Sequence, residues 1–227
     1  MKYMVVDTET TGLEGCRYHT SLPCAVMDNG DEILQIGGLF LDEAFNPIKG
    51  FCFYCDILRA GVPEAAFSVH GISIREIRKD LPNIFIEEVV HTELPELFED
   101  DLLFIGYNTD FDIKMLRQGL RNSPAEFGVF QPTASSIPRK GRWALDVMKY
   151  MPKRRKLASY SEQLKIPRER FYETFSQSLP IAFNFERLVQ ESFTGPHNAL
   201  YDVVETYLLF KEEVLDKRIF RGDRFGR

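Results

Sequence analysis

The sequence predicts a single α/β domain built on a mixed β-sheet. Three observations support this class: an apolar strand at 2–9, a strand pair at 31–43 and 46–57 joined by a short turn, and a strongly apolar strand at 102–108 followed by helically spaced residues at 109–121. A hairpin combined with a later strand–helix unit is typical of a sheet that contains both parallel and antiparallel strands.

The remaining segments predict helices and loops that cover this sheet. We expect a loop leading into a short helix at 61–77, short helices at 93–101, 142–151 and 156–165, loops at 14–30 and 122–142, and a long closing helix at 198–217. No Gly/Ser-rich or Pro-rich linker divides the chain, so we expect one domain over 1–216 and a basic tail over 217–227.

Composition and charge indicate a soluble protein with one uneven charge feature. The 227 residues carry a formal net charge of −6, yet residues 139–170 hold eleven Lys and Arg against three Asp and Glu. A basic segment on an acidic body suits a polyanion, and a solvated Lys/Arg-rich helix and loop would give the same pattern. No apolar run is long enough to span a membrane and the N-terminus is unlike a signal peptide, so we expect a cytoplasmic location and no membrane partner.

The four cysteines are interpreted as reduced structural thiols rather than a metal site. Cys52 and Cys55 form a CxxC within a predicted strand, where their side chains would point to opposite faces. Cys16 and Cys24 lack a common ligand spacing.

The chemistry of the chain centres on acids. Asp7 and Glu9 lie two residues apart at the end of the first strand, so both carboxylates can point to one place. Two close carboxylates repel each other unless a divalent cation such as Mg²⁺ or Mn²⁺ binds them, although two acids at an exposed strand end are also common. Asp202 shares a helical stripe with apolar residues, where it would be buried against metal or would simply favour the first turn of the helix.

Two further positions remain open on physical grounds alone. Asp110 and Asp112 both fall near the start of the predicted helix at 109–121, and Asp110 is the better capping candidate. His197 precedes the closing helix, where a neutral imidazole near a bound water would act as a general base or where an ordinary surface histidine would lie.

Together these residues resemble three motifs of the DEDD (DnaQ-like) 3′–5′ exonuclease superfamily. "VVDTETTGL" carries Asp7 and Glu9, "YNTDFDIKML" selects Asp112 over Asp110, and "HNALYD" carries His197 and Asp202. The position four residues before the last Asp is Asn198 rather than the Tyr of a sister branch, so the chain resembles the His branch (DEDDh). "SVHGIS" resembles a His-Gly-Ile loop and "ALDVM" an apolar-flanked Asp; residues 14–30 look inserted, and Tyr107 and Thr109 depart from the usual second motif.

The resemblance implies an RNase H-like fold and two-metal-ion hydrolysis of single-stranded nucleic acid from its 3′ end, with DNA favoured over RNA. Asp7, Glu9, Asp112 and Asp202 would hold two Mg²⁺ or Mn²⁺ ions, His197 would be the base, and the product would be a nucleoside 5′-monophosphate. Substrate contacts are expected from six residues: Thr10, Thr11, Gly12, Leu13, His70 and Asn108. The same resemblance allows a DNA polymerase as a protein partner, and leaves the oligomeric state open.

Two other classes stay open. One is a non-catalytic nucleic-acid-binding or polymerase-associated module with the same fold. The other is a different metal-dependent phosphotransferase on this fold, such as an endonuclease. Cleavage of a 3′-labelled strand separates the first from an exonuclease, and a circular strand separates the second.

Overall fold

The computed structural model describes residues 2–13, 30–98, 102–120, 144–151, 157, 179–184 and 197–215. The predicted loop at 14–30 apart from residue 30, the predicted loop at 122–142, nearly all of the short helix at 156–165, most of the basic segment and the tail lie outside these residues. No helix within the described part is long and apolar enough to cross a membrane.

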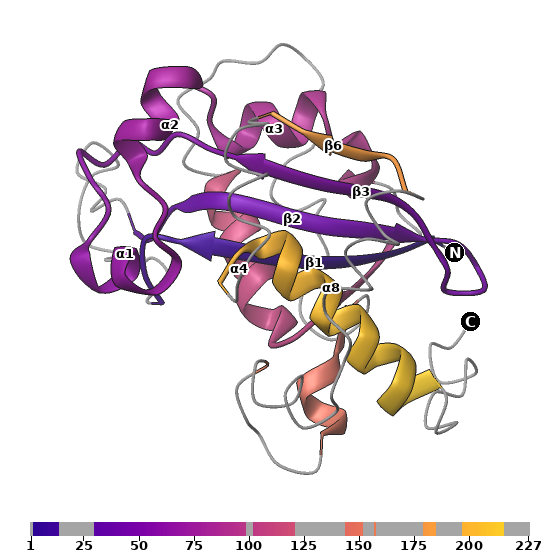
Figure 1. Cartoon of the computed structure of the whole chain (residues 1–227). Coiled ribbons are helices and arrows are strands. Elements are labelled where there is room, and N and C mark those ends of the chain that lie inside the picture. Colours follow the sequence, from indigo (N-terminus) through magenta and orange to yellow (C-terminus); the bar gives the residue numbers. More distant parts are fainter. Residues whose placement is uncertain are drawn as a thin grey trace, which may run out of the picture.

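The fold is built around one six-stranded mixed sheet with helices on both faces, as the sequence predicts (Figure 1). The strand order is β5-β4-β1-β2-β3-β6. The strands are β1 (Lys2–Thr10), β2 (Ile33–Leu41), β3 (Pro47–Tyr54), β4 (Leu102–Gly106), β5 (Ala144–Asp146) and β6 (Ile181–Phe183). β2 pairs antiparallel with β1 and β3, whereas β4, β5 and β6 join as parallel strands.

The helices lie between and after the strands along the chain. They are α1 (Glu64–His70), α2 (Ile74–Asp80), α3 (Ile86–Thr92), η1 (Pro95–Phe98), α4 (Thr109–Gly119), η2 (Val147–Tyr150), α8 (Ala199–Leu209) and a π-helical continuation, η3 (Phe210–Leu215). The predicted closing helix is therefore confirmed over its described length, and the expected helix at 61–77 is two helices separated by Gly71, whose φ of 68° ends α1.

The region 142–151 corrects one expectation. It begins as the three-residue edge strand β5, which pairs with β4, and only then turns into η2. The strand ends and the short helix begins at Asp146, because its side chain accepts a hydrogen bond from the backbone N–H of Met148 and caps the helix. Three residues carry too little periodicity to be read as a strand from the sequence.

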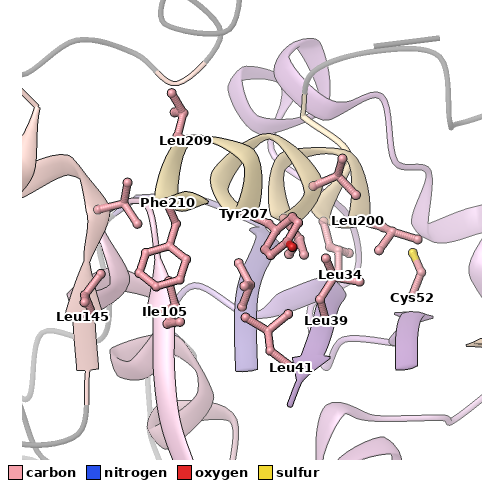
Figure 2. Packing of buried hydrophobic residues seen from close by; sticks show 14 of the residues in the cluster. Leu34, Leu39, Leu41, Cys52, Ile105, Leu145, Leu200, Tyr207, Leu209 and Phe210 are labelled. Carbon is pink, nitrogen blue, oxygen red and sulfur yellow. The ribbon is translucent and has the colours of Figure 1, made fainter. Parts of the chain in front are cut away.

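Two hydrophobic clusters fill the two faces of the sheet, because successive residues of each strand point to opposite sides. Val5, Leu39 and Ile105 pack with α8 on one face, and Figure 2 shows Tyr207 and Phe210 pointing toward residues of the strands. Met4, Phe40 and Phe104 pack with α3 and α4 on the other face. Cys52 and Cys55 are buried free thiols, one in each cluster, as the CxxC interpretation predicts.

Gly37 on β2 lets α8 approach the sheet. A Cβ built at Gly37 would lie 2.5 Å from the backbone N of Leu200 and 2.6 Å from the carbonyl carbon of Ala199. No side chain fits between backbone atoms that close, so this glycine sets the distance of the first turn of α8 from the sheet.

We predict that Gly37→Ala displaces the start of α8 and lowers the free energy of unfolding by about 1–3 kcal/mol, the usual cost of overpacking. Chemical denaturation measures this change. The matched control is Gly61→Ala, where an added Cβ has no heavy atom within 4 Å. Equal stability of the two variants would show that the close approach at Gly37 is not a constraint.

Candidate active site

The site begins at the end of β1, where the chain passes from the core to the edge of the sheet. Met4, Val5 and Val6 are fully buried, and Asp7 follows them directly. Asp7 and Glu9 share the strand face of Val5, which is the face covered by α8. Glu9 is buried and Asp7 partly exposed, so both carboxylates lie at the boundary between core and solvent.

The antiparallel pairing with β2 places α8 beside these acids. Gly37 lies directly opposite Asp7, and Gln35 lies opposite Glu9. The backbone of Ala199 packs on Gly37, and its N–H donates to Oε1 of the buried Gln35 at 2.9 Å. The first turn of α8, which carries Asp202, is therefore fixed over the end of β1.

The chain around His197 is held by capping bonds. Oδ1 of Asn198 accepts from the N–H groups of Leu200 and Tyr201, so Asn198 is the N-cap of α8. His197 has φ 67°, and its backbone N–H donates to Oδ2 of Asp202 at 3.1 Å. As expected from the sequence, His197 lies just before the helix, and its side chain is exposed.

The fourth acid comes from α4, which starts just beyond the end of β4. Because β4 runs parallel to β1, the ends of the two strands meet at the same edge of the sheet. Asp112 is only 2% exposed, and Oδ1 of its carboxylate accepts from the Thr8 hydroxyl at 2.8 Å. Asp110 instead lies nearer the surface, 3.7 Å from Nζ of Lys149.

The start of α4 differs from the capping expectation. Its N-cap is Asn108, with φ 68° and no side-chain capping bond, and Asp110 lies in the first turn without capping it. Asp146 stabilises this turn, since its Oδ1 accepts from the backbone N–H of Asn108 at 2.9 Å. The structure thus brings Asp112, and not Asp110, to the other acids.

All four carboxyl groups have pKa values above their ordinary range. Burial is the largest cause at each, and it raises the pKa of Glu9 to about 8 and those of Asp112 and Asp202 to about 7. The pKa of Asp7 is also raised well above its usual value, by burial and then by the charges of Asp112, Asp202 and Glu9. The repulsion links all four groups, so they form one electrostatic unit.

This donor set fits a hard divalent cation. Ligand atoms of Glu9, His197 and Asp202 all lie within 4.8 Å of one another, and this is the one such group among the described residues. Asp7 and Asp112 lie outside that compact group but interact with it through their charges. Carboxylate oxygens that repel one another in the protein alone are the ligands that Mg²⁺ and Mn²⁺ prefer.

The loop after β1 is held by its own hydrogen bonds. The Thr10 hydroxyl donates to the carbonyl of Gly12 at 2.7 Å, and the Thr11 hydroxyl accepts from the N–H of Glu32 at 2.9 Å. Thr11 is fully enclosed, so its side chain supports the loop rather than facing solvent. Leu13, by contrast, is 85% exposed.

His70, at the end of α1, lies beside this loop. Its Nδ1 accepts from the N–H of Ile72 at 2.9 Å, which leaves Nε2 as the protonated nitrogen of the neutral ring. Burial lowers the pKa of His70, the backbone of Thr10 favours the charged ring, and the charge of His197 lowers the pKa further. His70 therefore lies within electrostatic reach of both Thr10 and His197.

Three supporting residues were not predicted as part of the site: Thr8, Gln35 and Gly37. Each acts on another residue: Thr8 on the Asp112 carboxylate, Gln35 on the N–H of Ala199, and Gly37 on the spacing of α8. One feature of the sequence indicates the roles of Gln35 and Gly37, because both interrupt an otherwise apolar strand.

Comparison with known proteins identifies the family. The exonuclease family RNase_T matches residues 4–210, which is most of the chain. The chain therefore belongs to this exonuclease family, within the DEDD superfamily that the three motifs resemble. A search of the curated proteins found no match.

Solved structures agree with the fold. The chain is similar to Escherichia coli exonuclease I in a zinc-bound complex with single-stranded DNA, with a TM-score of 0.57, 18% identity, and coverage of 96% of this chain and 42% of that one. It is also similar to exonuclease I of Methylocaldum szegediense, with a TM-score of 0.54, 19% identity, and coverage of 94% and 41%. The chain thus spans about two-fifths of these relatives, and the likeness supports the RNase H-like fold.

The raised pKa values predict a pH-dependent stability of the metal-free protein. In the unfolded chain these carboxyl groups lose their protons near pH 4, whereas in the folded protein they keep them up to pH 7–8. The folded state therefore binds more protons, and this contribution to stability falls as the pH rises from about 4 to 8.

Asp202→Asn removes one charge from the cluster and tests this sign. In EDTA, we expect the melting temperature of the variant to exceed that of the wild type near pH 8, and this excess to be smaller near pH 5. Thermal unfolding at both pH values measures the difference. A variant less stable than the wild type at pH 8 would contradict the repulsion.

Proposed function

We propose that this chain is a metal-dependent 3′–5′ exonuclease that hydrolyses single-stranded nucleic acid, DNA in preference to RNA, to nucleoside 5′-monophosphates. The observation that carries the proposal is the convergence of Asp7, Glu9, Asp112 and Asp202 at one sheet edge, where burial raises the pKa of each. Family membership supplies the reaction class.

The four carboxylates would hold two divalent cations, Mg²⁺ or Mn²⁺. Such ions, when bound, lower the pKa of an attacking water and offset the charge that develops on the phosphate oxygens. The protein itself provides the fixed oxygens. Thr8 holds one oxygen of Asp112, and the His197 N–H holds one oxygen of Asp202, so these carboxylates are oriented before any ligand arrives.

We propose His197 as the general base, a role that would make the chain a member of the His branch. It is exposed, it sits on a turn fixed by Asp202 and Asn198, and a ring nitrogen lies within 4.8 Å of the Glu9 and Asp202 oxygens. From there a neutral imidazole can accept the proton of a water near those carboxylates.

The terminal nucleotide is proposed to lie against the loop after β1. The backbone of Thr10, Thr11 and Gly12 forms this loop, and the exposed Leu13 would wedge against the last base. His70 and Asn108 flank the acids from α1 and α4, where they would contact the sugar or phosphate.

The preference for DNA rests on relatives. E. coli exonuclease I has been solved with a dA16 oligonucleotide and shares the fold at a TM-score of 0.54 and 20% identity. On the basis of the same likeness, we propose a single-stranded 3′ end as the main partner of the chain. A polymerase partner stays a prediction from the family resemblance alone.

One time course tests the function: 3′- and 5′-labelled single strands of one sequence, as DNA and as RNA, with Mg²⁺, Mn²⁺ or EDTA. We expect a metal-dependent ladder that shortens from the 3′ end and releases 5′-monophosphates, faster on DNA. Cleavage of a circular strand would indicate an endonuclease. Strand binding without cleavage under either metal would indicate a non-catalytic module.

The placement of Asp112 predicts a contrast with its neighbour. We expect Asp112→Asn to lower kcat by more than about 100-fold, since even partners of metal ligands are worth 10–100-fold. Asp110→Asn weakens the solvent-exposed contact with Lys149 and should leave kcat near that of the wild type. Equal losses in the two variants would reject the assignment.

His197→Ala should lower kcat by about 10²–10⁴-fold if this imidazole takes the proton. The rate of the variant should also depend less on pH at the acid side of the pH–rate profile. The wild type loses rate there because a protonated imidazole cannot act as the base. His91→Ala on α3, whose ring lies 4.0 Å from Glu87, is the matched control. A full rate in His197→Ala would move the base role to another group.

A further inference from the structure

A small hollow lies between the start of β2, the start of α3 and the end of α4. It is lined by residues 31–33, 56, 58, 85–87, 118 and 119. Ile33 and Ile86 in its wall belong to the hydrophobic cluster on the α3 and α4 face of the sheet, whereas Asp7 and Glu9 share the face covered by α8. None of the four acids of the candidate active site lines it. The hollow is therefore a separate feature of the molecule.

Acidic side chains dominate the wall of this hollow, and no Lys, Arg or His lines it within the described part of the chain. The four acids are Asp31, Glu32, Asp56 and Glu87. Two arginines outside the hollow approach three of them. Nε of Arg78 lies 2.8 Å from Oδ1 of Asp56. Nη1 of Arg59 lies 3.8 Å from Oδ1 of Asp31, and its Nε lies 3.9 Å from Oε2 of Glu32. The fourth acid, Glu87, contacts neither arginine.

Glu87, in the first turn of α3, is a buried carboxyl group with one oxygen left unsatisfied. The residue is 5% exposed, and its Oε2 has no hydrogen-bond partner. Its Oε1 lies 4.0 Å from Nε2 of His91, which is beyond hydrogen-bond distance. Burial raises the pKa of Glu87 and lowers the pKa of His91, so the nearby imidazole is mainly neutral at pH 7. A buried acceptor in this state favours any donor that can enter the hollow.

The size of the hollow limits what can enter it. It encloses about 30 Å³ and widens into about 400 Å³ that includes solvent at its mouth. The enclosed part holds about one or two groups the size of a water molecule. An ammonium group has that size, a positive charge and three donors, whereas a guanidinium is a wider planar fork. Leu58, at 40% exposure, offers apolar surface to an alkyl chain attached to the ammonium.

The spacing of the acids does not suit a metal ion. Glu9, His197 and Asp202 are the one group of described residues in which three such ligand atoms lie within 4.8 Å of one another. The acids of the hollow are therefore too far apart to give one ion three side-chain ligands, whereas an ammonium needs only one close carboxylate and neighbouring acceptors.

We propose that this hollow binds a primary alkylammonium group, whose –NH₃⁺ donates to Oε2 of Glu87 and whose alkyl chain packs on Leu58. A free aliphatic amine and the lysine side chain of another protein both offer this chemistry. The site goes beyond the proposed nuclease function and does not depend on it.

The hollow shares Asp31 with the loop that follows β1. The Thr11 hydroxyl lies 3.5 Å from Oδ1 of Asp31, and a Cβ built on Gly12 would lie 2.5 Å from the same oxygen. An occupant of the hollow would therefore act on this loop from the side away from α8.

Calorimetric titration of the full chain with n-butylammonium chloride in EDTA tests the site. Glu87→Gln keeps the shape of the side chain and removes its charge. Glu88→Gln makes the same change at the next residue of α3, which does not line the hollow. We expect Glu87→Gln to weaken binding by roughly 10- to 150-fold, the range of a hydrogen bond to a charged group, and Glu88→Gln to bind as the wild type does.

Thermal unfolding checks that a loss of binding is not a loss of fold. Glu87→Gln removes a buried charge, so we expect it to melt no lower than the wild type without ligand. n-Butylammonium should then raise the melting temperature of the wild type and of Glu88→Gln, and leave that of Glu87→Gln unchanged.

Asp202→Asn separates this site from the catalytic acids, which also attract cations, and it should bind n-butylammonium as the wild type does. Equal affinities of Glu87→Gln and wild type, or a comparable loss in Asp202→Asn, would overturn the proposal. So would n-butylguanidinium binding more tightly than n-butylammonium. A tripeptide with a central lysine and blocked ends distinguishes the two sources: binding comparable to that of n-butylammonium assigns the site to a protein lysine, and weaker binding assigns it to a free amine.

Discussion

The repulsion among four carboxyl groups is the constraint to which the rest of the site responds. Asp7, Glu9, Asp112 and Asp202 come from one strand and two helices, and burial raises the pKa of each. Without a cation, the arrangement is unfavourable for every member in its charged form. Such a group persists only where the scaffold holds each acid in place and where binding of a cation offsets the cost.

The scaffold does this mainly through the backbone. The parallel pair β1 and β4 brings two strand ends to one edge, and the antiparallel β2 supplies Gly37 and Gln35 opposite the acids. The first turn of α8 lies on those two residues, so the register of the hairpin decides where Asp202 is. A shift of one residue in this pairing would turn Asp7 and Glu9 to the other face of the sheet.

Much of the candidate site was predictable from the sequence, because the residues within each motif lie close together along the chain. Asp7 and Glu9 share a strand face by their spacing, and His197 and Asp202 follow from the start of the closing helix. The choice of Asp112 rests on the resemblance to a motif, since capping physics made Asp110 the better cap but did not decide which acid joins the site. The structure adds the reason: Thr8 reaches Asp112 from a strand 104 positions away in sequence, and no local pattern reports such a contact. The edge strands β5 and β6 are three residues each, too short for a period.

The central claim is that the four acids form one cation site, and calorimetry of Mn²⁺ binding tests it most directly. Groups with pKa values of about 7–8 still hold protons near neutral pH, and a cation must displace them. Titrations near pH 7 in two buffers of different ionisation enthalpy give the number of protons released. The account predicts proton release on Mn²⁺ binding by the wild type and weaker binding with less release by Asp202→Asn. Binding without proton release, or identical titrations of the two proteins, would contradict it.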